Sequence, residues 1–375
     1  MYIRRRMIAL AIVLSFIAGI VAGALVLSNR TSDGQSAANV AKKRKQSAQQ
    51  HPAAPKEIRG VHISMGLASL PGKLDQYFAM QRQGLNTIEL DVKDETGQVA
   101  FPSRTAPLAT KIGAAKRFYN PHTVSIRAHA RGIYLIGRVV VFEDPVLSEN
   151  QPARAVQYSD GSVWHTYSGL GWTNPYDEKV WKYNVGIALA AAKAGFDEIQ
   201  FDYVRFPSDG DLSAIVYPVK RHERMGKTIA SFIRYAGARL HPLGVRVSAD
   251  VFGLSAHRDL GIGQAPRVLG RYLDTVSPMV YPSHYVPGEY QIPNPDAAPG
   301  PTVYRSLRDF RHQLRGRKAR LVPWLQAFSL GRTYSLEDMR AQVEAARQAK
   351  VGGFLLWNPE GSYLPQALKP ASAYP

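Results

Sequence analysis

The segment GFDEIQFDYVRFP, residues 195–207, decides the fold expected for this chain. Its glycine ends an Ala-rich helical run, and the alternation that follows is typical of a strand with Gln200, Asp202 and Val204 on one face. Pro207 cannot donate to a sheet ladder, so the strand is expected to stop there and open into a loop. Asp202 therefore lies near the carboxyl end of a strand, where the chemistry of parallel α/β proteins is usually found.

Strand-like apolar runs alternate with helix-like runs along the rest of the chain, which predicts βαβ units and a parallel sheet. The eight predicted strands are residues 60–64, 87–93, 134–142, 198–206, 246–252, 275–281, 321–328 and 353–357. The predicted helices are residues 74–83, 121–131, 177–194, 219–241, 265–272, 302–315 and 335–349. Eight strands in roughly 310 residues match an α/β fold of the (β/α)8 TIM barrel type. An open doubly wound sheet fits the alternation equally well, but no Gly-rich phosphate-binding loop follows the first strand.

The same segment resembles the hallmark of the DUF4015 family of glycosyl hydrolase domains, which is grouped with the TIM-barrel glycosidases. The resemblance extends from about Ile58 to Pro359. It implies a (β/α)8 barrel with glycosidase chemistry. The substrate and the catalytic residues are inferred below from the strand ends themselves.

Composition narrows the class of protein. Of the 375 residues, 45% are hydrophobic, enough for a substantial core, and the absence of cysteine excludes disulfides and thiolate metal sites. The net charge of +18 is uneven, since residues 1–56 hold nine Lys or Arg against one acid, which leaves +10 for the remainder. That charge favours solubility and attraction to an anionic envelope surface. No nucleic-acid partner is expected, because no helix-turn-helix, zinc or RNA-binding signature accompanies it.

The amino-terminal sequence has the pattern of an export signal. Three arginines, residues 4–6, precede an uncharged run over residues 7–27, which is long enough to cross a bilayer as a helix. We expect residues 1–30 to form a signal anchor in the inner (cytoplasmic) membrane with the arginines inside, which places the folded domain in the periplasm or outside the cell. Basic residues 42–45 oppose this orientation weakly. A signal peptide cleaved near residues 22–24 is the alternative, and it would make the domain secreted.

Two further boundaries follow from composition. Residues 31–56 are rich in Ser, Ala, Gln, Lys and Pro and are expected to form a flexible, basic linker. Residues 57–375 are then the folded domain, and no second domain or internal repeat stands out within them.

Pleat alternation predicts that polar side chains point inward near the carboxyl ends of the strands. The inward set is His62, Ser64, Glu89, Asp91, Lys93, Arg138, Gln200, Asp202, Ser248, Asp250, Met279, Tyr281, Trp324 and Gln326. An ordinary barrel interior is filled with Val, Ile and Leu. Several carboxylates can be buried together only if they are paired or used, and Lys93 and Arg138 are the cations available to pair with them.

Asp202 and Asp250 are the predicted catalytic pair. Glycoside hydrolysis needs one ionised and one protonated carboxyl group about 5 to 9.5 Å apart, and adjacent strand ends supply that spacing. Their placement resembles that of the nucleophile and the acid in amylase-like barrels, but those enzymes carry the acid as Glu on strand five and another Asp on strand seven, where this chain has Asp250 and Gln326. A nearby cation should keep Asp202 ionised, and drier surroundings should keep Asp250 protonated.

Each assignment has a structural alternative. Asp202 could instead form a salt bridge with Arg205 or Arg138, and Asp250 could cap the following turn. Glu360 follows the last strand and reads either as an acid or as a solvated loop residue. The predicted substrate-binding residues are His62, Asp91, Lys93, Arg138, Tyr203, Arg205, Tyr281, His284, Trp324, Gln326, Trp357 and Glu360.

Two long loops are expected to wall the site. Residues 143–174 contain Trp164, His165, Tyr167 and Trp172, and residues 281–301 are rich in Pro and Tyr. The aromatic rings could stack on sugars or simply pack the loops onto the barrel. No cofactor and no metal site are predicted, because the histidines lack metal-ligand spacing.

The leading prediction is a glycoside hydrolase that acts on an envelope or extracellular polysaccharide and is held at the membrane by its amino-terminal helix. The alternative is a barrel that binds glycan without cutting it. A polysaccharide-modifying metalloenzyme is a third class, but its Asp/His metal cluster is not found in the sequence. The sugar, the stereochemical outcome and the oligomeric state are left open.

Overall fold

The computed structural model describes residues 51–218 and 223–370, which belong to one compact unit, His51–Pro375. The strand segments in these ranges are β1 (Ile58–Ile63), β2 (Thr87–Lys93), β3 (Tyr134–Val140), β4 (Glu198–Asp202), β5 (Arg246–Phe252), β6 (Thr275–Met279), β7 (Arg320–Leu321), β8 (Trp324–Gln326) and β9 (Gly353–Trp357). All pairs are parallel, in the spatial order β5-β4-β3-β2-β1-β9-β8-β6-β7, and β5 also pairs with β6. The sheet is therefore closed.

β7 and β8 together make one wall of the barrel, so the nine segments correspond to eight strands. Pro323 lies between them and has no N–H to donate, which interrupts the ladder. β7 pairs with the start of β6 and β8 with its end, at Met279. The predicted (β/α)8 TIM barrel is thus confirmed, with its seventh strand broken in two.

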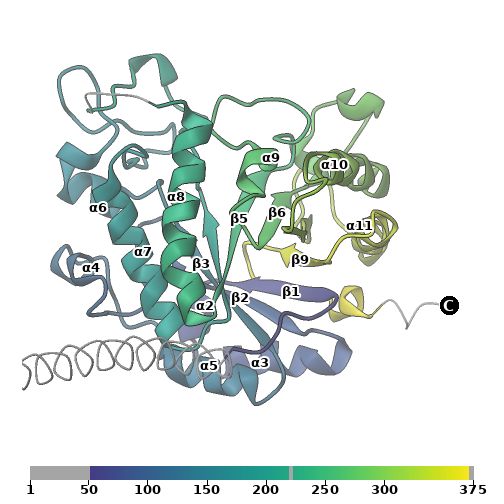
Figure 1. The fold of residues 1–375 in the computed structure, drawn as a ribbon. Coiled ribbons are helices and arrows are strands. Elements are labelled where there is room, and N and C mark those ends of the chain that lie inside the picture. Colours follow the sequence, from purple (N-terminus) through teal and green to yellow (C-terminus); the bar gives the residue numbers. More distant parts are fainter. Residues whose placement is uncertain (1–50, 219–222, 371–375) are drawn as a thin grey trace, which may run out of the picture. The chain divides into compact units, whose positions relative to one another are not determined.

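Helices lie outside the strands (Figure 1). They are α2 (Met65–Ser69), α3 (Lys73–Ala79), α4 (Pro107–Lys111), α5 (Pro121–His129), α6 (Pro145–Asn150), α7 (Glu178–Lys193), α8 (Met225–Leu240), α9 (Pro266–Leu269), α10 (Pro299–Gln313) and α11 (Leu336–Gln348), with 3-10 turns η1 (Met80–Gln83), η2 (Pro152–Arg154), η3 (Leu212–Ala214), η4 (His241–Leu243), η5 (Pro282–His284), η6 (Glu289–Gln291) and η7 (Pro365–Leu368). The predicted helices are found within a few residues of their expected bounds. Part of the one expected over residues 219–241 falls outside the described residues. The short helices α2, α4 and α6 were not predicted, because five or six residues do not display a helical period.

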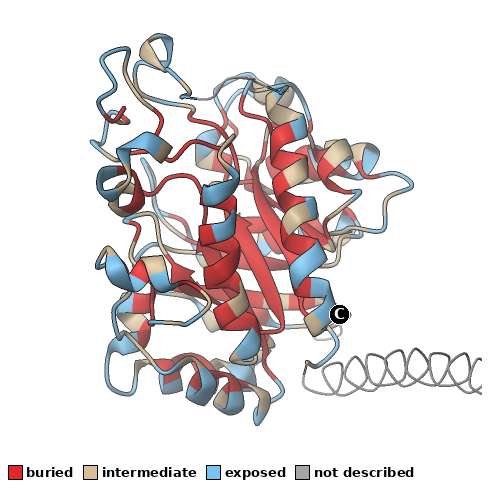
Figure 2. Cartoon of the chain, turned by 60° about the vertical axis from the view of Figure 1, so that its left-hand side comes forward, coloured by how far each residue is buried: buried red, intermediate tan, exposed pale blue. Residues whose placement is uncertain are grey.

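α7 shows how the local sequence sets an element. The Asp177 side chain accepts a hydrogen bond from the Lys179 backbone N–H at 2.7 Å and caps the first turn. Its Ala-rich face is buried against the sheet, and the exposed residues of the helices point away from it (Figure 2). Gly195 ends the helix with φ 103°, a left-handed conformation that favours glycine. The expected helix stop at this glycine is confirmed.

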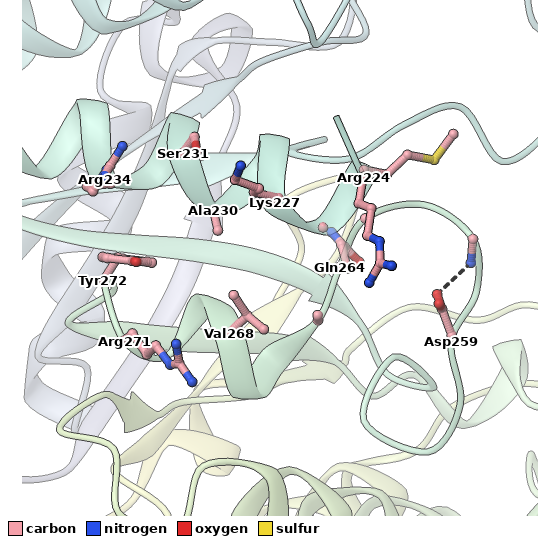
Figure 3. Close-up of a pocket in the computed structure, with 15 residues that line it drawn as sticks. Arg224, Lys227, Ala230, Ser231, Arg234, Asp259, Gln264, Val268, Arg271 and Tyr272 are labelled. Atoms are coloured by element: carbon pink, nitrogen blue, oxygen red, sulfur yellow. Dashed lines mark hydrogen bonds between the residues drawn. The ribbon is translucent and has the colours of Figure 1, made fainter. Parts of the chain in front are cut away.

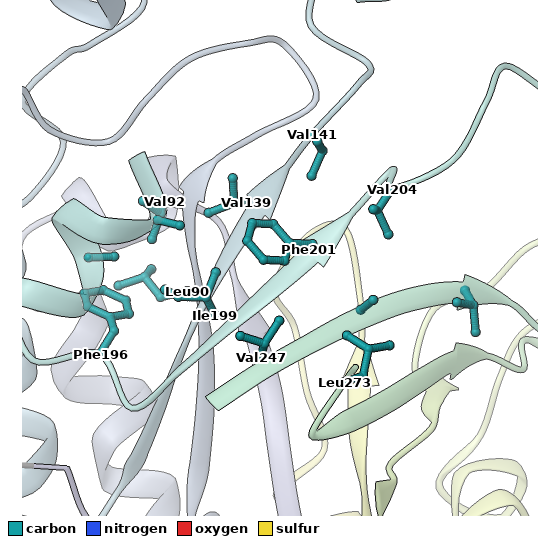
Figure 4. Close-up of a cluster of buried hydrophobic side chains, with 14 of the residues drawn as sticks. Leu90, Val92, Val139, Val141, Phe196, Ile199, Phe201, Val204, Val247 and Leu273 are labelled. Atoms are coloured by element: carbon teal, nitrogen blue, oxygen red, sulfur yellow. The ribbon is translucent and has the colours of Figure 1, made fainter. Parts of the chain in front are cut away.

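The main hydrophobic core lies between the strands and the helices. Outward side chains of neighbouring strands, such as Leu90, Val139, Ile199 and Val247, pack with Phe196 in this layer (Figure 4). All five are essentially inaccessible to solvent. Each buried side chain of this size contributes about 1.5–3 kcal/mol to folding. The expected outward apolar alternation is therefore confirmed for these strands.

A second apolar cluster fills the barrel interior and includes Ile58, Tyr134, Ile136 and Leu355. Toward the carboxyl ends of the barrel strands the buried inward residues include polar ones, as in Glu89, Arg138, Gln200 and Asp250. The interior is thus apolar toward the amino ends of the strands and charged toward their carboxyl ends.

Lys93 does not point inward as predicted. The β2–β3 register shifts between Asp91 and Lys93, so that Lys93 pairs with Val139, an outward position. Its ammonium group is fully buried on the outer side of the barrel, where it donates to the Asn184 side chain at 3.0 Å and pairs with Asp144 at 2.8 Å. The bulge is the physical reason for this correction, because one extra residue reverses the side-chain alternation.

The residues just before the barrel contact it. Arg320 donates to the carbonyl oxygens of Pro55 and Lys56 at 2.9 and 3.1 Å, and His51 lies 3.4 Å from the Asp197 carboxylate. In residues 51–218 and 223–370, no helix has the length and apolar character needed to span a membrane. The predicted membrane segment over residues 7–27 and most of the predicted linker lie outside the described residues.

We expect Lys93→Met to lower the free energy of unfolding by about 3–5 kcal/mol, because it leaves the Asp144 carboxylate buried without its cation. Denaturant unfolding followed by circular dichroism measures the change. Lys182→Met, at an exposed position on α7, is the matched control and should stay within about 0.5 kcal/mol of the wild type. Equal stability of the two variants would contradict the structural role given to Lys93.

Candidate active site

A cavity of about 590 Å³ opens at the carboxyl ends of the strands. It is lined by Arg138, Asp202, Tyr203, Arg205, Ser208, Asp250, Phe252, Gly253, Leu254, Leu260, Ile262, Met279, Tyr281, His284, Tyr285, Trp324 and Trp357. These residues come from β3, β4, β5, β6, β8 and β9 and from the loops that follow the strands. The volume lies within the range typical of small-molecule and cofactor sites.

Arg138 is the central cation of this cavity. Its guanidinium donates to Asp202 Oδ2 through Nε at 2.9 Å and Nη2 at 2.7 Å, and to Asp91 Oδ1 through Nη1 at 2.8 Å. The Tyr203 backbone N–H donates to the other Asp202 oxygen at 2.7 Å. Three donors thus converge on the Asp202 carboxylate, an environment that suits an ionised acceptor.

Asp250 has different surroundings. Its Oδ1 accepts a hydrogen bond from Trp324 Nε1 at 2.6 Å and another from Gln200 Nε2. Burial raises the Asp250 pKa well above its ordinary value, and the negative charge of Asp202 raises it further. Asp250 is therefore protonated under conditions in which an ordinary aspartate is ionised.

Glu89 is a second neutral carboxyl below the cavity. It is completely buried, and neither of its oxygens has a hydrogen-bond partner among the described residues. Burial raises its pKa well above the ordinary value, and Asp250 adds to this shift. Two of the carboxyl groups around Arg138 are thus neutral, which limits the negative charge inside the barrel.

Arg205 supplies a second cation at the cavity wall. Its guanidinium carbon lies 4.9 Å from the Trp172 ring centroid, 5.0 Å from that of Tyr203 and 4.7 Å from that of Phe252. It also donates to Ser208 Oγ at 3.0 Å. Cation–π contacts with three rings fix the orientation of this side chain.

The chain leaves β4 earlier than predicted. The strand ends at Asp202 rather than at residue 206, and Tyr203 adopts φ 47°, a left-handed conformation uncommon for a tyrosine. This turn carries Tyr203 and Arg205 into the cavity wall instead of the outward face, and it places Val204 in the outer core (Figure 4). The alternation expected for residues 203–205 was wrong for this reason.

Residues 60–363 match the model of the family DUF4015, described as "Putative glycosyl hydrolase domain". The chain belongs to this family.

Solved structures with TM-scores above 0.5 share the barrel fold of this chain. The PgaB (BpsB) glycoside hydrolase domain from Bordetella bronchiseptica has a TM-score of 0.57 at 15% identity and covers 84% of this chain and 99% of its own. The catalytic domain of β-amylase from Paenibacillus polymyxa has a TM-score of 0.51 at 11% identity, with 86% and 97% covered. A hypothetical protein from Ruminiclostridium thermocellum ATCC 27405 is 35% identical over 51% of this chain and 97% of its own, with a TM-score of 0.46. No curated protein matches the chain.

Most of the predicted site residues of this DUF4015 barrel meet at the cavity. Those that line it are Asp202, Asp250, Arg138, Tyr203, Arg205, Tyr281, His284, Trp324 and Trp357. His62 and Asp91 lie one layer behind, joined by a 3.0 Å hydrogen bond, and the His62 ring stacks on Trp357 at a centroid distance of 4.2 Å. These two residues hold the lining residues in place.

Three predicted substrate-binding residues lie elsewhere. Lys93 is on the outer side of the barrel, as described above. Gln326 is buried and accepts hydrogen bonds from the Ser283 backbone N–H and hydroxyl at 3.1 and 3.0 Å, so it anchors the loop after β6. Glu360 is exposed in the loop after β9, as its structural alternative predicts.

The loop over residues 143–174 packs onto the barrel, whereas stacking of its rings on sugars stays a prediction, because none of its residues is among those that line the cavity. Trp164 is buried and donates to the Asp211 carbonyl at 2.9 Å, which packs the loop onto the barrel. Trp172 instead supports the cavity wall through Arg205. Tyr167 is 83% exposed, and His165 pairs with Glu149 at 2.7 Å. No group of three or more metal-ligating side chains is found in the described part of the chain.

Glu143 is a buried carboxyl group near Arg205 that sequence reasoning missed. It follows β3, is buried, and pairs with Trp172 in an isolated bridge. Burial raises the Glu143 pKa from 4.5 to about 7, while the nearby Arg205 opposes the shift. Its place at the start of a loop expected to wall the site was the signal that could have identified it.

The folded protein is expected to lose stability as the pH rises through the Glu143 titration. The Glu143 pKa of about 7 lies above the unfolded value near 4.5, so the folded state binds the extra proton between these values. The effect of Glu143→Gln on the free energy of unfolding should therefore be about 3 kcal/mol more favourable at pH 8 than at pH 4, because about 1.4 kcal/mol is gained for each pH unit between 4.5 and about 7. Urea unfolding at both pH values measures this, and an effect that does not change with pH would contradict it.

Proposed function

We propose that this barrel hydrolyses the glycosidic bonds of an envelope or extracellular polysaccharide, with Asp202 and Asp250 as its catalytic carboxyl groups. The observation that carries the proposal is that both groups line one cavity but in opposite electrostatic settings. Asp202 receives three hydrogen bonds, two of them from the Arg138 guanidinium, whereas burial raises the Asp250 pKa. Glycoside hydrolysis requires one ionised and one protonated carboxyl group.

Asp250 would act as the general acid. Both of its hydrogen-bond donors contact Oδ1, and the described residues give the other oxygen no partner, so that oxygen can carry the proton toward the cavity. Protonation of the glycosidic oxygen accompanies cleavage of its bond to the anomeric carbon. The Asp202 carboxylate stabilises the positive charge that develops on the sugar. Water then supplies the hydroxyl group of the product, and its remaining proton returns to Asp250.

The cavity wall suits a sugar substrate. Tyr281, Trp324, Trp357 and Phe252 offer apolar ring faces, while Arg205 and His284 add polar groups at the rim. A largely apolar wall with a few fixed polar groups is typical of ligand sites. Family membership supports the reaction class, and the polysaccharide specificity rests on this wall and on the predicted export.

Export is part of the proposal and rests on the sequence of residues 1–30. A signal anchor there would hold the barrel on the outer side of the cytoplasmic membrane, and a cleaved signal peptide would release it. Either arrangement brings the cavity to a polysaccharide outside the cytoplasm.

A barrel that binds glycan without cutting it is the second candidate. The observation that favours it is that both carboxyl groups are already engaged by protein donors, Asp202 by Arg138 and Asp250 by Trp324. For catalysis, the two carboxyl groups would have to act on the substrate while they keep these hydrogen bonds.

We expect Asp202→Asn to abolish hydrolysis of a glycan that the wild type cleaves, because the amide cannot stabilise the oxocarbenium-like transition state. Binding should remain within a few-fold. Asp250→Asn should lose about 10²–10⁴-fold on substrates with poor leaving groups and much less on activated aryl glycosides, which need little protonation. Steady-state kinetics on both substrate types and calorimetric binding measure these effects.

Asp160→Asn is the matched control, since Asp160 is exposed and hydrogen-bonds only within its own turn. It should retain wild-type rates. Undiminished turnover by Asp202→Asn would rule out the assignment. Tight binding of a glycan that the wild type never cleaves would favour the binding barrel instead.

A further inference from the structure

A second cavity of about 710 Å³ lies between α8 and the segment around α9 (Figure 3). α8 contributes Lys227 and Arg234, Arg224 directly precedes α8, and Arg271 follows α9 on the other side. We call it the basic groove. Asp259 is the one acid among its lining residues, and its carboxylate accepts a hydrogen bond from the Gly261 backbone N–H at 2.9 Å.

Most of the positive charge in the basic groove is uncompensated. Lys227 pairs with Glu223 at 2.7 Å, but Arg224, Arg234 and Arg271 have no side-chain hydrogen bond or ion pair with any described residue. Free guanidinium groups that face a common cavity recognise carboxylate, sulfate or phosphate groups through paired N–H donors. The lining also includes apolar residues, such as Ala230 and Val268, alongside Gln264 and Tyr272.

The basic groove and the catalytic cavity share one loop. Leu260 and Ile262 line the catalytic cavity, whereas Gly261 and Gly263, which alternate with them, line the groove. A single loop therefore forms the wall between the two. Gly263 has φ 80°, and a Cβ there would come within 2.9 Å of Ile229, so the loop lies tightly against α8 at this point.

Gln264 connects the groove to the catalytic strand. It is buried, and its side chain accepts from the Phe252 N–H at 2.8 Å and donates to the Asp250 carbonyl at 3.0 Å. Gln264 also lines the groove. A polymer chain that leaves the catalytic cavity thus has one well-anchored loop to cross before it meets the guanidinium groups.

We propose that the polysaccharide substrate is anionic and that the basic groove binds an acidic group on a unit next to the cleaved one. This inference rests on the proposed hydrolysis. In the catalytic cavity the Arg138 guanidinium is already paired with Asp202 and Asp91, and that of Arg205 packs against three rings. The groove arginines are unpaired among the described residues, so the acidic substituent is best held in the groove. Charge attraction to the groove would also speed the encounter and make it sensitive to salt.

The test measures binding rather than turnover, in full-length protein carrying Asp202→Asn so that no probe is consumed. The probes are labelled hexagalacturonate, its methyl ester as the neutral match, and a heparin-derived hexasaccharide. Arg234→Gln/Arg271→Gln should weaken binding of at least one acidic probe about tenfold or more and leave the methyl ester unaffected. The single variants, each at an exposed position, should show a smaller loss and guard against misfolding of the pair.

Arg239→Gln/Arg267→Gln is the matched control. It removes the same charge from exposed positions on α8 and α9 that do not line the groove, and it should bind as the parent does. Equal losses in the two pairs would mean that only the overall charge matters and would overturn the proposal. So would a parent protein that binds neither acidic probe better than the methyl ester.

Vesicles containing phosphatidylglycerol test whether the groove binds lipid phosphates instead of an acidic glycan. If the double variant Arg234→Gln/Arg271→Gln lost vesicle binding while its glycan binding was unchanged, the groove would bind a membrane surface and the proposal would be wrong. The binding test can be separated from the test of catalysis. If Arg234→Gln/Arg271→Gln weakened acidic-glycan binding but the wild type cleaved no glycan, the proposed role of the groove would stand and the proposed hydrolysis would be rejected. If the wild type cleaved a neutral glycan and Arg234→Gln/Arg271→Gln had no effect on binding, the hydrolysis would stand and the role of the groove would be rejected.

Discussion

The Arg138 guanidinium is the group on which the arrangement of the carboxyl end of the barrel depends. It is buried on β3 and donates to Asp91 on β2 and to Asp202 on β4. A buried cation is costly without partners, and two buried carboxylates would repel each other without it, so each group makes the burial of the others tolerable. The Trp357 ring, 5.2 Å from the guanidinium carbon, also stacks on His62, which ties the aromatic wall to the same network.

One guanidinium cannot neutralise every carboxyl group around it. Glu89 and Asp250 accept no hydrogen bond from this guanidinium. They retain their protons, because burial raises the pKa of each. The retained proton of Asp250, beside an Asp202 carboxylate held by three hydrogen-bond donors, thus follows from charge balance in a closed interior. The proposed glycoside hydrolysis requires a protonated acid of this kind, so in that proposal the same constraint that stabilises the barrel separates the roles assigned to its two aspartates.

The barrel and most of its inward side chains could be predicted because period-two alternation depends only on local backbone geometry. The errors lie where the backbone leaves the regular pleat. Lys93 follows a bulge and Tyr203 has φ 47°. Neither feature can be recognised from the hydrophobic pattern of the sequence. Glu143 and Gln326 were misjudged for another reason: their environments depend on Arg205 and Ser283, which are distant in sequence.

The left-handed Tyr203 shows where the fold accepts strain. A tyrosine in this conformation costs of order 1–3 kcal/mol, and a glycine would relieve it. Yet this turn directs the Tyr203 N–H to Asp202 at 2.7 Å and places the ring 5.0 Å from Arg205. A glycine would retain the N–H but lose the ring that fixes the cation. Strain located at the residue that orients both a carboxylate and a guanidinium indicates a site in which precise placement outweighs local stability.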